Sequence, residues 1–369
     1  METDVLIIGG GPAGLSAAYE TASRGLNVTI IEETWYLGGQ LVQQTQSFED
    51  MPNHYRQLCG FEIAENLIKK VEPFGIHVLT DHTLIGLYEN GEMGISNDRD
   101  VFPVKASKII MATGAAEIAV PFPKWTLPGI MTAGAAQILI NRDRVLPGTK
   151  TILIGSSSFA FELAKQLHEV GIEVKGIVEQ QSDIVLQNNC LIDEIEKLNI
   201  PILKNTKVIE AEGKGQVETL VIESNQGPQR IDVDFVCLDG GRNPILEAFL
   251  IANCSLSYRK ILGGWVPDYD LNFETSSEGV YVAGNSTGIT SKAAIFLTGS
   301  LSGISVCESL GKINSTEASQ MKNLFWEELY QVEQQVNLEG WNSRLKHIEG
   351  YMGPNSHQSL SGIGRKING

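Results

Sequence analysis

The chain has 369 residues, of which 42% are hydrophobic and 20% are charged, a balance that fills the cores of two or three globular domains. Lys and Arg total 28 against 44 Asp and Glu, so the formal net charge is −16. This charge repels phosphate backbones and anionic lipids, which argues against nucleic acid and membrane surfaces as partners. No apolar stretch reaches the roughly 20 residues of a membrane span, so we expect no such span.

The five cysteines are scattered along the chain, without a Cys-x-x-Cys pair or a closely spaced cluster. This pattern argues against a zinc site, an iron–sulfur cluster and a dithiol redox centre. Scattered thiols of this kind are typical of a reducing compartment, so we expect a cytoplasmic protein. The six histidines show no metal-ligand spacing and no nucleophile or acid beside them, so the sequence predicts neither a metal site nor a catalytic side chain.

A strand, a glycine turn and a helix open the chain. The apolar run from Asp4 to Ile8 is followed by Gly9-Gly10-Gly11-Pro12-Ala13-Gly14 and then by a helix-forming segment. Gly9 permits the tight turn, Gly11 lets a pyrophosphate approach the backbone, and Gly14 lets the helix pack closely on the strand. The helix N-terminus attracts a diphosphate through its free N–H groups. We therefore predict a dinucleotide site at Gly9, Gly11, Pro12, Ala13 and Gly14.

Two acidic residues, Glu32 and Glu33, follow the second apolar run, Val28 to Ile31. They lie about 20 residues beyond the glycine turn, where a carboxylate accepts hydrogen bonds from an adenosine ribose. Glu32 directly follows the apolar run and is therefore the preferred ribose ligand, with Glu33 beside it. The alternative, a glycine turn that binds nothing, is disfavoured because strand, helix and acidic residue all occupy their expected places.

Three later segments indicate which nucleotide binds. Leu37-Gly38-Gly39-Gln40 closely follows Glu32, Ile109 to Gly114 is an apolar run that ends in Ala-Thr-Gly, and Glu278 to Asn285 ends in Gly-Asn. Together with the glycine turn, these segments resemble the flavoproteins with two dinucleotide-binding domains, a family that includes thioredoxin reductase and the pyridine nucleotide-disulfide oxidoreductases. The resemblance extends from Asp4 to about Gly311 and implies FAD as the cofactor.

In that family the Gly-Gly-Gln segment lies along the flavin, the Ala-Thr-Gly turn closes the FAD domain, and a late Gly-Asp holds the ribityl chain. The resemblance thus implies further FAD-binding residues, namely Gly38, Gly39, Gln40, Thr113, Gly114, Gly284, Asn285 and Ala293. Asn285 stands where the family has Asp, and either an amide serves in its place or the site is lost. The helix that begins near Thr290 is implied to point its N-terminus at the flavin pyrimidine. Lys292 either adds its charge there or, as we favour, is a solvated surface lysine.

The strand–turn–helix pattern recurs in the middle of the chain with altered glycines. The turn Gly155-Ser156-Ser157-Ser158-Phe159-Ala160 follows an apolar run, and Glu179 ends the next one. The Ser157 side chain crowds the position where a pyrophosphate approaches the backbone, whereas Ala160 is tolerated. Glu179 favours NAD over NADP. Two interpretations stay open: a weak NAD(H) site at Gly155, Ser157, Ala160 and Glu179, or a domain kept for architecture.

The two motifs predict an α/β fold of two Rossmann-like three-layer domains (ββα/βαβ), the second inserted into the first, with a C-terminal helical tail. We expect an FAD-binding domain over 1–114 and 270–315, an inserted domain over 115–245, a return linker over 246–269 and a tail over 316–369. Apolar residues at helical spacing predict one amphipathic tail helix that ends near Gly340. Residues 353–369, rich in Gly, Ser and Asn, are expected to form a loose extension.

The segment between the two motifs narrows the resemblance. Residues 125–135 read Trp-x-x-Pro-Gly-x-x-Thr-Ala-Gly-Ala, and Val145-Leu146-Pro147-Gly148 follows. This linker resembles that of the flavoprotein subunits of amino-acid, opine and proline dehydrogenases and of hydrogen cyanide synthase. It implies the electron-transferring subunit of an amino-acid or secondary-amine dehydrogenase, in a homo- or hetero-oligomer with a second flavoprotein subunit. Two alternatives remain, a standalone NAD(P)H-dependent reductase of the ferredoxin-reductase type and a non-catalytic nucleotide-binding assembly subunit.

Overall fold

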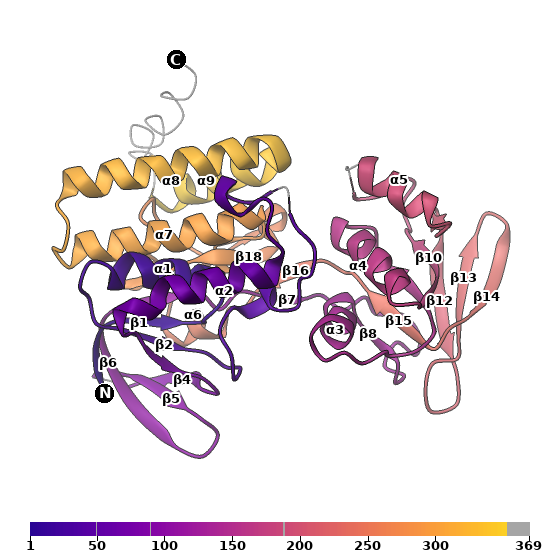
Figure 1. Cartoon of the computed structure of the whole chain (residues 1–369), viewed down its shortest axis with the longest axis horizontal. Coiled ribbons are helices and arrows are strands. Elements are labelled where there is room, and N and C mark those ends of the chain that lie inside the picture. The colour runs from indigo at the N-terminus through magenta and orange to yellow at the C-terminus, as the bar shows by residue number, and fades with distance from the viewer. Residues whose placement is uncertain (49, 89, 187–188, 353–369) are drawn as a thin grey trace. The chain divides into compact units, whose positions relative to one another are not determined.

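The computed structural model describes residues 1–48, 50–88, 90–186 and 189–352, which form two compact units. Unit 1 comprises residues 1–116 and the described part of 243–369, and unit 2 comprises residues 117–242. Each unit is built on a mainly parallel sheet, and the second interrupts the sequence of the first. The predicted α/β class with two Rossmann-like domains, one inserted into the other, is confirmed (Figure 1).

The strands of unit 1 are β1 Glu2–Ile8, β2 Val28–Ile31, β3 His77–Leu79, β4 Thr83–Leu87, β5 Met93–Ser96, β6 Val101–Met111, β17 Leu256–Arg259, β18 Gly264–Pro267 and β19 Val280–Val282. Its helices are α1 Pro12–Ala22, α2 Gly60–Val71, α6 Glu247–Ile251, α7 Lys292–Ser309, α8 Ser315–Val336 and α9 Leu338–Met352. Its short helical turns are η1 Gly39–Leu41, η2 Asn53–Tyr55, η3 Glu72–Phe74, η5 Lys260–Leu262 and η6 Gly284–Thr287.

The main sheet of unit 1 runs in the order β3-β2-β1-β6-β5-β4, with β19 also paired to β6. Strand β1 lies between β2 and β6, parallel to both, so that Ile8 pairs with Ile31 and with Met111. Strand β19 is parallel to β6 as well, with Val282 opposite Met111. The carboxyl ends of these strands therefore meet at one edge of the sheet, which is where ligands bind in open α/β folds.

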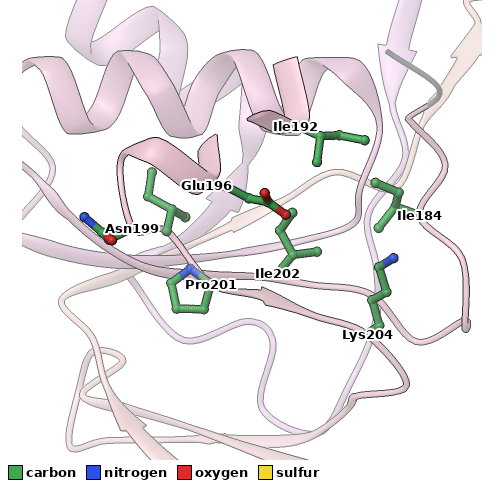
Figure 2. Close-up of a pocket in the computed structure, with 8 residues that line it drawn as sticks. Ile184, Ile192, Glu196, Asn199, Pro201, Ile202 and Lys204 are labelled. Atoms are coloured by element: carbon green, nitrogen blue, oxygen red, sulfur yellow. The ribbon is translucent and has the colours of Figure 1, made fainter. Parts of the chain in front are cut away.

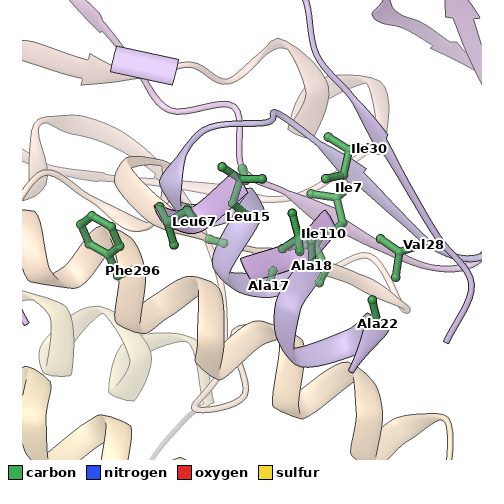
Figure 3. Packing of buried hydrophobic residues seen from close by; sticks show 14 of the residues in the cluster. Ile7, Leu15, Ala17, Ala18, Ala22, Val28, Ile30, Leu67, Ile110 and Phe296 are labelled. Atoms are coloured by element: carbon green, nitrogen blue, oxygen red, sulfur yellow. The ribbon is translucent and has the colours of Figure 1, made fainter. Parts of the chain in front are cut away.

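Strand β1 is an unbroken apolar run because both faces of the sheet are covered. Val5 and Ile7 belong to the cluster with α1 and α2, whereas Leu6 and Ile8 belong to a second cluster that includes residues of α7, α8 and α9. Figure 3 shows Ile7 beside Leu15 and other α1 side chains in the first of these clusters. Because β1 is packed on both faces, the start of the glycine turn that follows Ile8 is held in place.

Helices α1 and α7 pack backbone to backbone. A Cβ atom on Gly299 of α7 would lie 2.3 Å from the carbonyl oxygen of Ala13, and one on Gly303 would lie 3.0 Å from that of Ala17. The two helices run side by side in Figure 1. Small residues allow this approach, which holds the start of α7 and the segment before it against α1.

The tail forms two helices in place of the single predicted one. Helix α8 ends at Val336, the backbone leaves the helical region at Asn337, and the Asn337 Oδ1 accepts from the N–H of Gly340 in α9. The prediction of one helix that ends near Gly340 is wrong because an asparagine can end one helix and cap the next. Trp326 and Trp341 are buried in the second cluster of unit 1. Residues 353–369 lie outside the described residues.

Residues 246–269, expected as a return linker, belong to unit 1 and form α6, β17, η5 and β18. The short strands β7 (Ala115–Glu117) and β16 (Arg242–Pro244) lie where the chain passes between the units. Among the described residues, no helix combines the length and the apolar character that crossing a bilayer requires.

The elements of unit 2 are β8 Ile130–Thr132, α3 Ala133–Gln137, η4 Ile138–Arg142, β9 Lys150–Ile154, α4 Ser158–Glu169, β10 Glu173–Val178, α5 Asn189–Lys197, β11 Ile202–Leu203, β12 Lys207–Glu212, β13 Thr219–Ser224, β14 Gly227–Asp232 and β15 Phe235–Leu238. Its parallel sheet has the order β11-β10-β9-β15-β8. One core cluster joins this sheet to the helices, and another joins it to residues of the antiparallel sheet β12-β13-β14. Unit 2 therefore has three layers, namely the helices, the parallel sheet and the antiparallel sheet.

Candidate functional site

The first glycine turn joins β1 to α1 and leaves no room for side chains at two of its glycines. Gly9 has φ +106°, and a Cβ atom there would lie 2.3 Å from the carbonyl oxygen of Ala112. A Cβ atom on Gly14 would lie 1.9 Å from the carbonyl oxygen of Gly9. Gly11 differs, since the nearest atom to its Cβ would be the Gly39 Cα at 3.8 Å. The backbone at Gly11 is therefore open in the sense that a Cβ atom there would make only an ordinary van der Waals contact, with the Gly39 Cα.

The N-terminus of α1 is correspondingly uncapped. Gly11 is the N-cap residue, no side chain of the described residues caps the helix, and Pro12 occupies the first turn with its fixed φ. The first N–H groups of a helix have no intrahelical partner and carry a partial positive charge. Ala13 and Gly14 belong to this first turn, and both are buried. The arrangement can hold a diphosphate.

Glu32 lies directly under the turn and is 6% exposed. Its Oε2 accepts from the Gly10 N–H at 2.7 Å, and its Oε1 accepts from the N–H and the hydroxyl of Thr34 at 2.9 Å and 2.8 Å. A carboxylate oxygen accepts more than one hydrogen bond, so a ribose hydroxyl can still be bound. Glu33 is exposed, and its pKa is raised by partial desolvation and by the charge of Glu32.

The segment Gly38 to Gln40 lies against the same turn. The Gly38 N–H donates to the carbonyl oxygen of Gly10 at 2.9 Å. Gly39 has φ +54°, and a Cβ atom there would lie 2.9 Å from the Gly11 Cα. Gln40 is exposed, and its Oε1 accepts from the Gln43 Nε2 at 2.5 Å. The structure thus places Gly38 and Gly39 beside the open backbone of Gly11.

The segments that follow β6 and β19 are joined by a serine that the sequence did not single out. The Ser286 Oγ lies 3.1 Å from the Thr113 Oγ1 and accepts from the Gly114 N–H at 3.2 Å. A Cβ atom on Gly284 would lie 2.7 Å from the Ala13 Cβ. Thr113, Gly114, Gly284 and the half-buried Asn285 therefore gather near the start of α1. The position of Ser286 next to Gly284-Asn285 was the available signal.

The N-terminus of α7 is not free in this structure. The Lys292 N–H donates to the Asp50 Oδ2 at 3.0 Å, the Ala293 N–H donates to the Asp50 carbonyl oxygen at 2.9 Å, and the Ala294 N–H donates to the Ser291 Oγ at 3.2 Å. Ala293 is fully buried. A ligand that reached these N–H groups would compete with Asp50.

Lys292 is not the solvated lysine that the sequence suggested. Its Nζ lies 3.2 Å from the Asp50 Oδ1 and 4.5 Å from the centroid of the Phe48 ring, and its side chain is 32% exposed. The aliphatic stem covers apolar surface while the ammonium group is paired, a common arrangement for lysine. The prediction failed because the partner, Asp50, lies 242 positions earlier in the chain.

The second glycine turn, between β9 and α4, is filled by side chains of unit 2. Gly155 has φ +108°, and a Cβ atom there would lie 2.1 Å from the carbonyl oxygen of Asp239. The Ser157 Oγ caps α4 by accepting from the Phe159 N–H at 3.2 Å. The Ser157 N–H donates to the Asp239 Oδ2 at 3.1 Å. A carboxylate thus accepts from a backbone N–H group at the N-terminus of α4, the kind of group that binds a pyrophosphate in this motif.

Glu179 is likewise engaged within unit 2. It is 8% exposed, its Oε2 accepts from the Ser156 hydroxyl at 2.5 Å, and its Oε1 accepts from the Gln181 N–H at 2.8 Å. The Ser156 Oγ in turn accepts from the Val185 N–H at 2.9 Å. Ala160 is fully buried in the core. The candidate NAD(H) residues lie together, but their polar groups are joined to protein groups.

The hollow shown in Figure 2 lies elsewhere in unit 2, beside α5 and β11. Its lining is partly apolar and consists of Ile184, Ile192, Glu196, Asn199, Ile200, Pro201, Ile202 and Lys204. None of Gly155, Ser157, Ala160 and Glu179 lines it. This hollow is therefore separate from the second glycine turn.

The described residues include all five cysteines, and none of these forms a disulfide. Burial raises the pKa of Cys237 to about 12 and that of Cys307 to about 11, so both are protonated at neutral pH. In the part of the chain that the structure describes, no three His, Cys, Asp or Glu side chains are grouped to hold a metal ion.

The parallel sheets and the glycine turns that follow their strands define a protein of the Rossmann-like α/β class with two such units. Residues 3–306 match the pyridine nucleotide-disulphide oxidoreductase family, and the chain belongs to that family. It is an oxidoreductase of this family, as the sequence predicted.

The curated relatives that match include subunits of opine oxidase and of hydrogen cyanide synthase. An opine oxidase subunit of Agrobacterium tumefaciens (strain Ach5) is 27% identical over 86% of this chain and 67% of the relative. The hydrogen cyanide synthase subunit HcnB of Pseudomonas protegens is 26% identical over 87% of this chain and 74% of the relative. The chain thus spans about two thirds to three quarters of these relatives.

Two solved structures show the same fold. L-Proline dehydrogenase from P. horikoshii has a TM-score of 0.71 and 23% identity, over 88% of this chain and 58% of that chain. Thioredoxin reductase from T. acidophilum has a TM-score of 0.69 and 21% identity, over 84% of this chain and 99% of that chain. The fold expected from the sequence resemblance is thereby confirmed.

Proposed function

We propose that unit 1 binds FAD and that the protein is the electron-transferring flavoprotein subunit of an amino-acid or secondary-amine dehydrogenase. The observation that carries this proposal is the open backbone of Gly11 at the uncapped N-terminus of α1, between two glycines that tolerate no Cβ atom. FAD supplies two-electron redox chemistry, and the protein supplies binding, orientation and electrostatics.

Each group around the turn has a role in this proposal. Gly9, Gly11, Pro12, Ala13 and Gly14 form the diphosphate cradle, with Gly38, Gly39 and Gln40 beside it. Glu32, with Glu33 at its outer side, accepts from the adenosine ribose. Thr113, Gly114, Gly284 and Asn285 border the remainder of the dinucleotide, and Ala293 begins the helix that follows. The amide of Asn285 donates and accepts in place of a carboxylate.

The assignment to amine oxidation rests on the relatives. The matching chains of opine oxidase and of hydrogen cyanide synthase are both named as subunits, which supports a second chain as the partner of this one. L-Proline dehydrogenase, whose name gives as substrate an amino acid with a secondary amine, shares the fold. Because the match spans about two thirds to three quarters of those two relatives, the complete reaction is assigned to the complex.

The competing function is a standalone NAD(P)H-dependent reductase, which needs a nicotinamide dinucleotide on α4. The Asp239 carboxylate at the Ser157 N–H argues against that ligand, since it repels a pyrophosphate. NAD(H) binding at Gly155, Ser157, Ala160 and Glu179 is therefore the weaker proposal. The same argument leaves the partner subunit, rather than NADH, as the source of electrons.

The experiment is purification from the native source, followed by a visible spectrum, mass analysis of the released ligand and identification of co-eluting chains. We expect one FAD per chain and a second flavoprotein subunit in the same fraction. A colourless chain that takes up no FAD on reconstitution would overturn the proposal. A loaded chain that no amine or amino acid reduces, even with its partner, would instead make it a non-catalytic assembly subunit.

A further inference from the structure

The two tail helices meet in a buried ion pair. Arg344 of α9 and Glu333 of α8 are both 0% exposed, and the Arg344 Nη2 lies 3.6 Å from the Glu333 Oε1. Two polar atoms of the pair, the Glu333 Oε2 and the Arg344 Nε, have no hydrogen-bond partner among the described residues. Burying these charges has a large desolvation cost, which the single long contact between them offsets only in part.

Most of the other bonds of this pair end on one short segment, residues 287–291. The Arg344 Nη1 donates to the Thr287 Oγ1 at 2.8 Å, and the Nη2 donates to the Thr290 Oγ1 at 2.7 Å. The Ser291 hydroxyl, which caps α7, donates to the Glu333 Oε1 at 3.3 Å. Outside the segment, the Arg344 Nη1 reaches the Tyr269 hydroxyl at 3.2 Å.

The same segment is joined to the first glycine turn. The Thr287 hydroxyl donates to the carbonyl oxygen of Gly284 at 2.8 Å, and Gly284 lies against Ala13 in the first turn of α1. A continuous chain of contacts therefore runs from α9, through Thr287 and Gly284, to the helix end that presents the open Gly11 backbone.

A buried ion pair is weak evidence for stability, because apolar residues of similar volume often give an equal or more stable fold. Its best-supported use is to fix one arrangement among several. We infer that Arg344 and Glu333 are positioning residues, through which the helical tail holds residues 284–291 in place beside the nucleotide cradle. The expected effect on FAD affinity rests on the proposed function, whereas the positioning of residues 284–291 by the ion pair does not.

The test compares three variants in the full chain. The double variant Glu333→Leu/Arg344→Met replaces both charges by apolar groups. Arg344→Lys keeps both charges of the pair but loses the planar, two-pronged geometry of the guanidinium group. Lys322→Met is the matched control. The Lys322 Nζ of α8 pairs with the Glu308 Oε2 of α7 at 2.6 Å, so this substitution also removes an ion pair between the tail and α7, but one that lies away from residues 284–291. Hydrogen exchange of residues 284–294 is measured without FAD, and FAD affinity separately.

We expect the double variant to unfold at a similar denaturant concentration, while exchange in residues 284–294 accelerates about tenfold, equivalent to about 1.4 kcal/mol of local stability. FAD affinity falls about tenfold, Arg344→Lys gives a smaller change in both quantities, and Lys322→Met gives neither. Unchanged exchange of residues 284–294 in the double variant overturns the inference. If the wild-type chain binds no FAD, the proposed function fails while the exchange result still decides the positioning role.

Discussion

At the scale of single residues, substitutions at Gly11 and Gly14 are expected to affect different properties, namely FAD affinity at Gly11 and stability at Gly14. The Gly11 backbone is extended, at φ −74° and ψ −175°, and its Cβ would meet nothing closer than 3.8 Å. We expect Gly11→Ala to change the free energy of unfolding by less than about 1 kcal/mol, since only the helix cap is slightly poorer. The added methyl group blocks the approach of the diphosphate, so FAD affinity, measured by fluorescence titration, falls at least about tenfold.

Gly14→Ala behaves in the opposite way, because its Cβ would lie 1.9 Å from a backbone carbonyl that cannot move aside cheaply. We expect it to lower the free energy of unfolding by about 3 kcal/mol or more. Gly86→Ala is the control, since a Cβ atom there meets nothing within 4 Å. A Gly11→Ala protein that binds FAD like the wild type would mean that the diphosphate does not lie on this turn.

His347 gives the tail a dependence on pH. Burial lowers the pKa of His347, and its Nε2 lies 2.9 Å from the carbonyl oxygen of Pro267, so the neutral ring donates through Nε2. Between this lowered pKa and about 6.5 the unfolded chain binds more protons than the native chain. The contribution of His347 to stability is therefore complete above about pH 6.5 and declines as the pH falls below it.

We expect His347→Gln, which still donates to Pro267 but does not titrate, to lose less stability than the wild type between about pH 7.5 and 5.5. The measurement is urea unfolding across that range for both proteins. His168→Gln is the control, because His168 is exposed in unit 2. Parallel pH profiles for the wild type and His347→Gln would show that His347 titrates as in the unfolded chain.

At the scale of elements, the sequence predicted best where one local rule decides the structure. Val28–Ile31 was predicted at the bounds that β2 adopts, because a short apolar run between polar residues suits a strand covered on both faces. The glycine turn at Gly9 and the helix after it followed from local steric requirements. The change from glycine to Ser157 likewise indicated that the second site is altered.

What the sequence did not predict depends on residues far apart in the chain. Asp50 reaches the start of α7, and Asp239 reaches the start of α4, across 242 and 82 positions. Helix α9 was missed because its buried face includes Arg344 and His347, which an apolar periodicity does not count. Such pairings follow from the tertiary fold and have no periodic signature.

Asp50 supports a prediction about α7 as an element. Its carboxylate accepts from the Lys292 N–H and pairs with the Lys292 ammonium group. We expect Asp50→Ala to lower the free energy of unfolding by about 1 kcal/mol, typical of a lost helix cap, and Asp50→Asn to lower it less because an amide oxygen still accepts. Urea unfolding of the apoprotein checks this.

Glu65→Ala is the matched control for Asp50→Ala, since Glu65 pairs with Lys69 at 3.4 Å on the exposed face of α2. Exposed pairs of this kind contribute only a few tenths of a kcal/mol. Equal losses for Asp50→Ala and Glu65→Ala would mean that Asp50 does not cap α7 in solution.

At the scale of the whole molecule, the two units share the strand–turn–helix arrangement but differ at the N-terminus of the helix. In unit 1 the N-terminus of α1 is uncapped and its glycine backbone is open. In unit 2 the N-terminus of α4 is capped by Ser157 and faces Asp239. This contrast between one open and one filled turn supports the proposed function, in which the protein keeps a single dinucleotide and exchanges electrons with a partner subunit rather than with a diffusing nicotinamide.

This contrast predicts the response to NADH. We expect anaerobic addition of NADH to the FAD-loaded wild type to leave the flavin oxidised, because the Asp239 carboxylate opposes binding of the pyrophosphate. The double variant Ser157→Gly/Asp239→Asn removes the crowding side chain and the charge, at a cost of a few tenths of a kcal/mol for the weaker cap. Calorimetric titration should then show NADH binding at least about tenfold tighter than in the wild type, equivalent to about 1.4 kcal/mol. Rapid flavin reduction by NADH in the wild type would instead identify a standalone reductase, since electrons would then enter through unit 2 without any partner.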